Sequence, residues 1–283
     1  MQTDLVEVTT TDGLSLSGAL FTPSKMASGP IDAFVFFHGD GGHFYRPLYL
    51  GMGEYFSQRG IAFITANRRG HDMVAGGAPG GRLQGYAFES VAESPLDFGA
   101  WVDFLRNKGY TKIAIGGHSG GAVRAVYTQA TTPSPNVVAV ISVSPGEYDH
   151  EGIIALHNEA FTGPYQQATK NVASGSPDAF LSPGVPWGSM WTAQAYSECF
   201  HPDNRYSVSR HAENTRCPTL FVFGSEECAG PQILPVCGAA RKAVTAAEFP
   251  HVHVETVNGA NHGYKEREAR LYTVIFDWIE TIT

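Results

Sequence analysis

The amino-acid sequence predicts an α/β fold in which helices cover both faces of a mostly parallel central sheet. The first observation is a set of short, almost uninterrupted apolar runs, which are typical of strands buried on both faces. These runs span 33–37, 61–66, 112–116, 137–142 and 219–223, and a further strand is expected over 252–257. The second observation is that segments with helical spacing separate most of the runs. Strands that alternate with helices in this way form parallel sheets.

The remaining elements follow from local patterns. Two alternating segments, 5–10 and 14–21, flank Thr11-Asp12-Gly13 and predict an N-terminal β-hairpin. Glycines at 60 and 109 mark the ends of two predicted helices. A Gly-rich stretch at 68–85 is expected to be a long loop, and such loops usually have a functional reason. Helices are expected over 48–59, 95–108, 122–129, 235–247 and 265–282.

Residues 145–216 have a different character from the rest of the chain. This stretch is rich in Pro, Gly, Ser and aromatic residues, and it lacks strong strand runs. We therefore expect an inserted cap of short helices and loops over 145–216. The core domain is expected to comprise 1–144 and 217–283.

Composition bounds the partners that this chain can have. The 283 residues include 43% hydrophobic and 16% charged residues, which is enough apolar material for a sizeable core. The net charge is −8, and no run of Lys or Arg stands out, so neither nucleic acid nor anionic lipid is an expected partner. No apolar stretch is long enough to span a bilayer, and the start of the chain has no signal-peptide pattern. Residence in the cytoplasm is the expectation.

The four cysteines, at 199, 217, 228 and 237, all lie in the last third of the chain. They form no C-x-x-C pair, which disfavours a zinc site. Free thiols are expected, with a Cys228–Cys237 or a Cys199–Cys217 disulfide as the alternatives.

The strongest chemical signal is Gly117-His118-Ser119-Gly120-Gly121, which follows one predicted strand and precedes a predicted helix. This G-x-S-x-G motif in a strand–turn–helix setting predicts a nucleophile elbow that carries Ser119. The serine occupies a strained turn, and the glycines two residues before and after it avoid a clash where the chain passes itself. The start of the following helix favours a developing negative charge.

A second motif, His38-Gly39-Asp40-Gly41-Gly42, follows the run at 33–37. A loop in this position supplies one backbone N–H of an oxyanion hole, and the residue after the nucleophile supplies the other. We therefore expect the N–H groups of Asp40 and Gly120 to bind the oxyanion, with Gly41 as the alternative to Asp40.

The third signal is His262, which lies between the last predicted strand and the last predicted helix. A base carried there can reach back over the sheet, and the near-neutral pKa of histidine suits the task. Its acid partner is expected in the loop after the run at 219–223, where Glu227 is the first candidate and Glu226 the second. Glu147 and Asp149, after the preceding strand, remain further alternatives.

These residues occur in the order and element context of the α/β-hydrolase superfamily, which the chain resembles over nearly its whole length. The segments 85–97 and 101–105, with the elbow, also resemble a subgroup of fungal and bacterial hydrolases that includes esterases of hydroxamate siderophores. Gly120 departs from the superfamily pattern because many members carry a larger residue there, and the acid is Glu rather than the commoner Asp. The resemblance implies the α/β-hydrolase fold and a serine esterase-like or lipase-like activity.

The predicted function is hydrolysis of a small-molecule carboxylic ester or lactone through Ser119, His262 and a glutamate, without metal or organic cofactor. The same residues would serve a peptidase, an amidase or an acyltransferase, and a binding protein without turnover is the alternative from another class. A homodimer is among the assemblies that the sequence allows. Three arginines, Arg46, Arg69 and Arg82, are candidates for recognising an anionic substrate group, although solvated surface positions are the simpler interpretation. Candidates for lining the substrate pocket are Phe44, Tyr45, Trp187, Met190, Trp191 and Tyr196.

Overall fold

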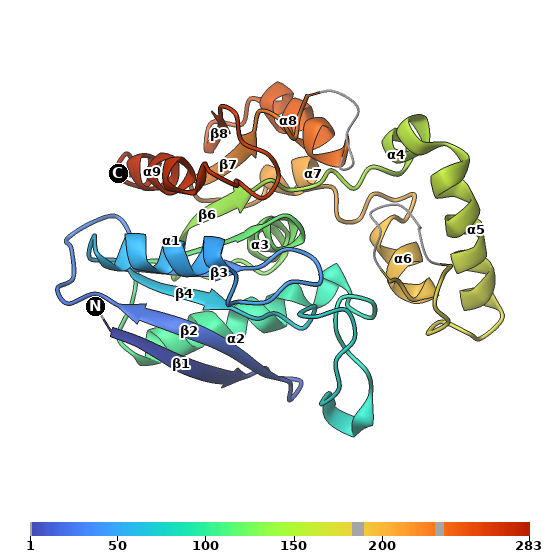
Figure 1. Cartoon of the computed structure of the whole chain (residues 1–283), viewed down its shortest axis with the longest axis horizontal. Coiled ribbons are helices and arrows are strands. Elements are labelled where there is room, and N and C mark those ends of the chain that lie inside the picture. Colours follow the sequence, from blue (N-terminus) through green and yellow to red (C-terminus); the bar gives the residue numbers. More distant parts are fainter. Residues whose placement is uncertain (1, 183–189, 230–234) are drawn as a thin grey trace.

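A computed structural model of the chain describes residues 2–182, 190–229 and 235–283 and contains an eight-stranded central sheet (Figure 1). The spatial order of the strands is β1-β2-β4-β3-β5-β6-β7-β8. β2 is antiparallel to both β1 and β4, and every other neighbouring pair is parallel. The predicted mostly parallel sheet is confirmed. The strands are β1 Gln2–Thr9, β2 Ser15–Thr22, β3 Ala33–Phe37, β4 Ala62–Ala66, β5 Ile113–His118, β6 Val137–Val143, β7 Thr219–Gly224 and β8 Val252–Val257.

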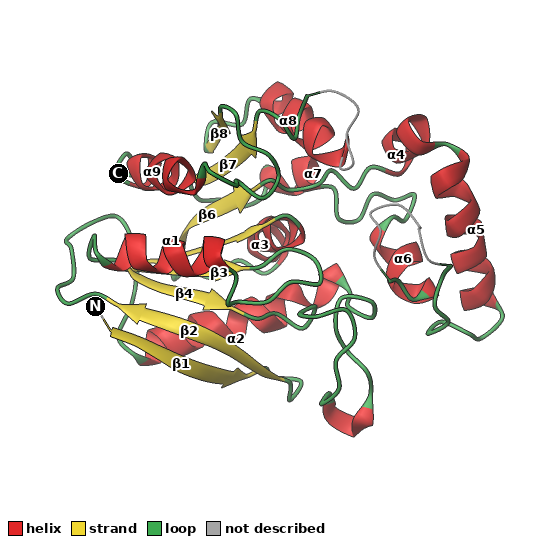
Figure 2. Cartoon of the chain, in the orientation of Figure 1, coloured by secondary structure: helices red, strands yellow, loops and turns green. Residues whose placement is uncertain are grey.

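Helices cover both faces of this sheet (Figure 2). One core cluster joins one face to the apolar sides of α1 (Pro47–Ser57) and α9 (Glu268–Ile279). A second cluster joins the other face to α2 (Ser94–Asn107), α3 (Gly120–Thr131) and α8 (Pro235–Ala247). Strands β3, β4, β5 and β7 are buried along their whole length, because helices lie on both sides of them. This double burial is the physical cause of their unbroken apolar sequences.

The loop at 68–85 connects β4 to the region before α2 and contains a short 3-10 helix, Pro79–Gly81. A second 3-10 turn, Val91–Glu93, leads directly into α2 and begins with a capping box of Ser90 and Glu93. The N–H and C=O groups of Ala75 and Gln84 form hydrogen bonds with each other. These bonds bring two distant points of the loop together.

The segment that was predicted to be a cap contains four helices: α4 (His150–His157), α5 (Glu159–Ala173), α6 (Ala193–Cys199) and α7 (Val208–Ala212). The first three stand beyond the end of the sheet in Figure 1 and enclose an aromatic cluster around Phe161, Tyr196 and Phe200. Val208 and Ala212 of α7 belong instead to the core cluster beside α3 and α8. The segment 145–216 thus holds both a projecting group of helices and one helix of the core layer.

All four cysteines are free thiols, so neither alternative disulfide forms. Burial raises the pKa of Cys199 and Cys237 well above the ordinary thiol value, which keeps both thiols protonated. Among the helices that the structure describes, none combines the length and the apolar character needed to cross a membrane.

Candidate active site

The loops that follow β3, β5, β6, β7 and β8 meet at one edge of the sheet. Ser119 lies there, between the end of β5 and the start of α3, with φ 55° and ψ −122°. A non-glycine residue in this region of backbone conformation carries strain of about 1–3 kcal/mol and is held there by its surroundings. The Ser119 N–H donates to the carbonyl oxygen of Val143 at 2.8 Å, which fixes the turn to β6.

Two glycines make the turn possible, as the motif predicts. A Cβ on Gly117 would overlap the backbone of Gly121, and a Cβ on Gly121 would overlap the backbone at Phe37 and His38. The backbone segments at Gly117 and Gly121 therefore lie so close to each other, and to the end of β3, that only glycine fits at these two positions.

The imidazole of His262 is held by Glu227. The distance between His262 Nδ1 and Glu227 Oε2 is 2.7 Å, so Nδ1–H donates to the carboxylate and Nε2 is left free to accept a proton. The other carboxylate oxygen accepts from the Gly224 N–H at 2.6 Å and the Ser144 hydroxyl at 2.7 Å. The side chain of Glu227 is only 2% exposed, and hydrogen bonds to both carboxylate oxygens fix its orientation.

The competing acids serve other partners. Glu226 is exposed, and its carboxylate makes no hydrogen bond to the rest of the described chain. Glu147 accepts from the Ser209 N–H at 3.2 Å, and burial raises its pKa. Asp149 caps α4 through the Gly152 N–H.

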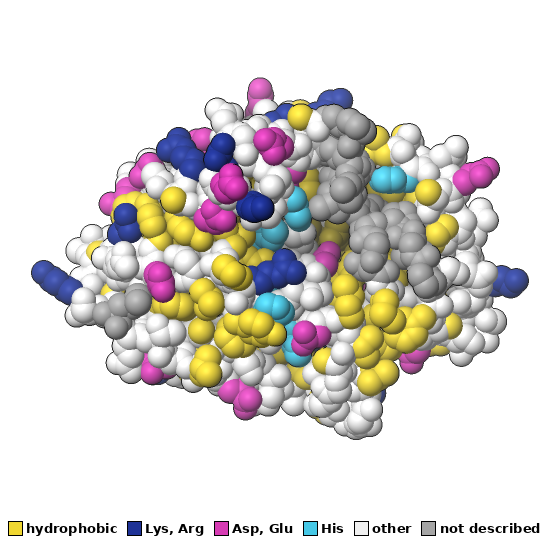
Figure 3. Space-filling model, in the orientation of Figure 1, with side chains coloured by type: hydrophobic (Ala, Val, Ile, Leu, Met, Phe, Trp, Pro, Cys, Tyr) yellow, Lys and Arg dark blue, Asp and Glu magenta, His cyan; other side chains and the backbone are white. Residues whose placement is uncertain are grey.

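Ser119 and His262 line the same cavity of about 210 Å³, beside the aromatic cluster around Phe161, Tyr196 and Phe200. Figure 3 shows histidine side chains near the centre of this face of the molecule, with apolar side chains around them. Within the described residues, the Ser119 hydroxyl and the His262 imidazole are not hydrogen-bonded to each other. Contacts of this kind often tighten only when substrate binds.

The glycine-rich loop after β3 lies against the serine. A Cβ on Gly39 would stand 3.1 Å from the Cβ of Ser119, and Asp40 lines the cavity. Gly120 is the first residue of α3, and the N–H groups of the first helical turn have no partner within their helix. The structure thus brings the predicted pair, Asp40 and Gly120, to the same side of Ser119.

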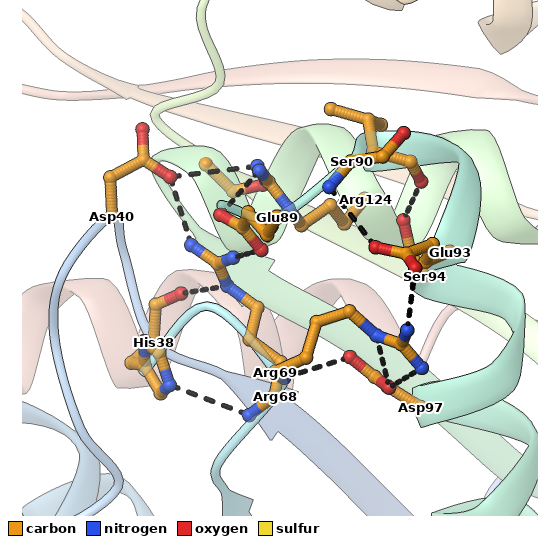
Figure 4. Close-up of polar contacts among 12 residues, drawn as sticks. His38, Asp40, Arg68, Arg69, Glu89, Ser90, Glu93, Ser94, Asp97 and Arg124 are labelled. Atoms are coloured by element: carbon orange, nitrogen blue, oxygen red, sulfur yellow. Dashed lines mark hydrogen bonds and ion pairs between the residues drawn. The ribbon is translucent and has the colours of Figure 1, made fainter. Parts of the chain in front are cut away.

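The two members of this pair also fit each other through the side chain of Asp40. A Cβ on Gly120 would overlap the Asp40 carboxylate, which explains why a larger residue does not stand at position 120. The carboxylate in turn accepts from Arg68 Nη2 at 2.8 Å and from Arg124 Nη1 at 3.5 Å (Figure 4).

Both arginines are buried and share a second carboxylate, Glu89. Arg68 Nη1 and Arg124 Nη2 each donate to Glu89, the latter at 2.6 Å. Arg124 Nη1 also donates to the carbonyl oxygen of Gly120 at 2.9 Å. Burial acts to lower the pKa of Arg124, but the carboxylates of Glu89 and Asp40 raise it above its ordinary value. Two positive and two negative charges therefore balance under the glycine-rich loop after β3 and the elbow.

A chain of hydrogen bonds joins the loops on the opposite side of the elbow. Burial, followed by the nearby His262, lowers the pKa of His118 to about 3, so its ring is neutral. Its Nε2–H donates to the His262 carbonyl oxygen at 2.7 Å, which leaves Nδ1 to accept from the Tyr49 hydroxyl at 3.1 Å. The Tyr49 oxygen accepts from the Gly39 N–H at 3.2 Å. The glycine-rich loop after β3, α1, the elbow and the loop of His262 are thus linked in one series.

The predicted pocket residues are distributed in several environments. Trp191 lines the cavity and packs on Tyr86, with ring centroids 4.5 Å apart. Tyr196 is fully buried in the aromatic cluster with Phe161 and Phe200, and Phe44 is half-buried against the α1–α9 core. Tyr45 and Met190 are 55% and 48% exposed. Trp187 lies outside the described residues.

Sequence reasoning missed several residues of the cavity wall. Tyr148 follows the carboxyl end of β6, so the rule that sites form beyond such ends could have found it. Tyr86 lies in the loop that the sequence marked only as long, and Cys237 lies in the first turn of α8. The described residues that line the cavity are Gly39, Asp40, Arg46, Tyr86, His118, Ser119, Gly120, Gly146, Tyr148, Trp191, Phe200, Val236, Cys237 and His262.

The three candidate arginines also separate. Arg46 is exposed at the cavity, whereas Arg82 is exposed beside another hollow near the 68–85 loop. Arg69 is 6% exposed and is paired with Asp12, Glu93 and Asp97. Neither substrate recognition nor a solvated surface position describes Arg69, because its guanidinium is enclosed by carboxylates.

One group of metal-type ligands occurs in the described part of the chain. Atoms of Glu227, Cys237 and His262 lie within 4.8 Å of one another. The group coincides with the carboxylate–imidazole pair, and Cys237 Sγ is 3.8 Å from His262 Nδ1. A metal ion there would have to replace the hydrogen bond from His262 to Glu227.

Comparison with known proteins gives a match in structure alone. No family model and no curated protein matches the sequence. Among solved structures, the α/β hydrolase GrgF from Penicillium sp. sh18 is similar, with a TM-score of 0.69 and 16% identity over 99% of this chain and 98% of that one. Est1E from Butyrivibrio proteoclasticus, solved with ferulic acid bound, is similar with a TM-score of 0.66 and 17% identity, over 97% of this chain and 98% of that one. Monoacylglycerol lipase from Paleococcus ferrophilus is similar with a TM-score of 0.68 and 18% identity, over 95% of this chain and 99% of that one.

These matches span nearly all of each chain and agree with the sheet order and the helix layers described above. The protein therefore has the α/β-hydrolase fold.

Proposed function

We propose that the protein is a serine hydrolase that cleaves carboxylic esters, including lactones, by acyl transfer to water. The observation that carries the proposal is the strained Ser119 in one cavity with His262, whose Nδ1–H is directed at the buried Glu227. Such a serine is exposed on a sharp turn and needs an adjacent base to become a nucleophile. The esterases and the lipase among the similar structures support ester chemistry.

The proposed reaction has two steps. His262 Nε2 removes the Ser119 proton as the hydroxyl attacks the ester carbonyl, and Glu227 stabilises the resulting imidazolium. The oxyanion accepts from the N–H groups of Asp40 and Gly120, each of which contributes about 10²–10³ in rate. His262 then protonates the leaving alcohol, and water repeats the sequence on the acyl-enzyme. The cavity volume of about 210 Å³ suits a short acyl chain or a single ring next to the serine.

A fluorophosphonate probe tests the activated serine. We expect one adduct on Ser119 by mass spectrometry, its absence in Ser119→Ala, and much slower labelling in His262→Ala. Hydrolysis of a short ester should fall about 10⁶-fold in either variant. A folded wild-type protein that neither reacts with the probe nor hydrolyses esters would instead favour a binding protein without turnover.

Paired substrates separate the remaining alternatives. An ester and the amide with the same acyl group should differ strongly in kcat/KM, with the ester ahead. Faster cleavage of the amide would replace this proposal with a peptidase or amidase. Transfer of the acyl group to an added alcohol in preference to water would indicate an acyltransferase.

A further inference from the structure

Two buried tyrosines on the cavity wall have hydroxyls that make no hydrogen bond to any other described residue. Tyr86 and Tyr148 are 2% and 7% exposed, and both line the cavity with Ser119. Neither hydroxyl has a hydrogen-bond partner among the described residues. Neither hydroxyl oxygen is completely buried, so each remains accessible to a small molecule. Buried polar groups are normally paired, so two unpaired phenols on a cavity wall point to a partner supplied by the ligand.

Asp40 presents a third unused polar atom beside them. Its Oδ1 accepts from both Arg68 and Arg124, while its Oδ2 has no partner in the described part of the chain. The side chain is 24% exposed and lines the same cavity. A carboxylate has about four acceptor positions, so Oδ2 retains the capacity to accept from a ligand.

The charges beneath this wall do not favour a cationic ligand group. Arg68, Arg124, Asp40 and Glu89 together carry no net charge, so an added ammonium group would find no uncompensated anion. Burial, followed by the Asp40 carboxylate, raises the pKa of Tyr86 and of Tyr148 well above the ordinary phenol value. Both phenols are therefore O–H donors at neutral pH, next to a carboxylate acceptor.

A hydroxyl group matches this set, since it can donate and accept at once. We propose that Asp40, Tyr86 and Tyr148 form a subsite for a hydroxyl group of the substrate, close to the reacting carbonyl. The substrate O–H donates to Asp40 Oδ2, and its oxygen accepts from Tyr86 or Tyr148. The subsite begins beside the carbonyl because Asp40 also carries a proposed oxyanion donor. This inference rests on the proposed ester hydrolase and narrows its substrates to hydroxy esters.

Two matched pairs of esters test the subsite. Methyl 3-hydroxybutanoate, as each enantiomer, is compared with methyl butanoate, and 2-hydroxyethyl acetate with propyl acetate. The first pair places the hydroxyl on the acyl side and the second on the alcohol side. After correction for alkaline hydrolysis rates, we expect the hydroxy ester of at least one pair to have a kcat/KM about tenfold or more above its partner, as for a hydrogen bond to a charged group.

The variants Tyr86→Phe and Tyr148→Phe keep the rings and remove the hydroxyls. At least one should reduce the preference to about threefold or less. Tyr127→Phe is the matched control, because Tyr127 packs on Tyr206 and His211 away from the cavity wall, and it should keep the wild-type preference. The labelling rate of Ser119 by the fluorophosphonate, which has no hydroxyl, is measured for each variant to show that the nucleophile is intact.

The outcomes distinguish the two proposals. Equal hydrolysis within both pairs, with normal labelling of Ser119, overturns the hydroxyl subsite and leaves the ester hydrolase standing. A preference that persists in both tyrosine variants also overturns the assignment. No labelling and no hydrolysis of any ester counts against the hydrolase itself.

Discussion

At the scale of single residues, the fit between Gly120 and Asp40 ties the elbow to the glycine-rich loop after β3. Gly120→Ala would drive its Cβ into the Asp40 carboxylate, and the carboxylate cannot leave without breaking its ion pairs with two buried arginines, which would then share Glu89 alone. We expect a loss of about 10²–10³ in kcat, as for one oxyanion donor, and of up to about 3–5 kcal/mol in unfolding free energy. Kinetics on a short ester and urea denaturation measure the two effects.

Gly99→Ala provides the matched control for this substitution. Gly99 is exposed within α2, and a Cβ there would meet nothing within 4 Å. This variant should keep full activity and gain up to about 1 kcal/mol, because alanine is the better helix former. Full activity in Gly120→Ala would show that the Asp40 carboxylate is not held over the elbow.

The two adjacent glutamates that are candidates for the acid also differ at this scale. Glu227 contacts His262 Nδ1 and is buried, whereas Glu226 is exposed. Glu227→Gln should lower kcat by about 10⁴-fold, because the amide no longer holds the imidazole in the required tautomer. Glu226→Gln should stay within about threefold of the wild type. Steady-state kinetics of both variants on one ester make the comparison, and a reversed order would transfer the role to Glu226.

At the scale of elements, the position of the elbow depends on the series from Gly39 through Tyr49 and His118 to His262. Tyr49→Phe removes the central hydroxyl and leaves the Gly39 N–H and His118 Nδ1 without their partner. We expect slower labelling of Ser119, about tenfold, and a loss of about 1–3 kcal/mol in unfolding free energy. Tyr272→Phe removes a hydroxyl that donates to the Leu48 carbonyl, also on α1, and should reduce stability without slowing the labelling.

The elements themselves were largely predictable from sequence, for physical reasons. The bounds of β3, β8 and α8 agree with the predicted ranges, because the double burial of β3, the alternating burial of β8 and the helical periodicity of α8 each leave a clear pattern. The helix after Ser119 begins at Gly120, two residues before the predicted start at 122. The prediction began late because the first two residues of the helix are glycines, which have a low helix propensity. Gly60, with φ 85°, follows α1 as expected of a glycine at a helix end.

The contact of His262 with Glu227 and their place near Ser119 followed from motif and chain order, but the pocket wall did not. Aromatic character gave Tyr196 as a pocket residue, although it packs inside the aromatic cluster. Tyr86 was missed because nothing in a local sequence distinguishes a ring that lines a cavity from one that fills a core, whereas Tyr148 could have been found from its place after the carboxyl end of β6. The burial of Arg69 was missed for a related reason, since its acidic partners come from distant segments.

At the scale of the whole molecule, two buried neutral histidines couple stability to pH. His38 is 0% exposed and His118 is 5% exposed. Burial, followed by Arg68 for His38 and by His262 for His118, lowers the pKa of both, that of His118 to about 3. In the unfolded chain both titrate near 6.5. Below that pH the unfolded state therefore binds protons that the folded state does not, so stability falls as the pH falls.

We expect unfolding free energy to be unaffected by these histidines above pH 7.5 and to lose about 2 kcal/mol per histidine between pH 7.5 and 5. Urea denaturation at four pH values in this window measures the slope. His118→Asn should remove about half of the loss while keeping a donor toward the His262 carbonyl. Because the raised pKa values of Asp97 and Glu147 are shared by both proteins, they cancel in the comparison. Parallel pH profiles of wild type and variant would mean that His118 takes up a proton in the folded state, and the neutral tautomer that joins Tyr49 to His262 would be wrong.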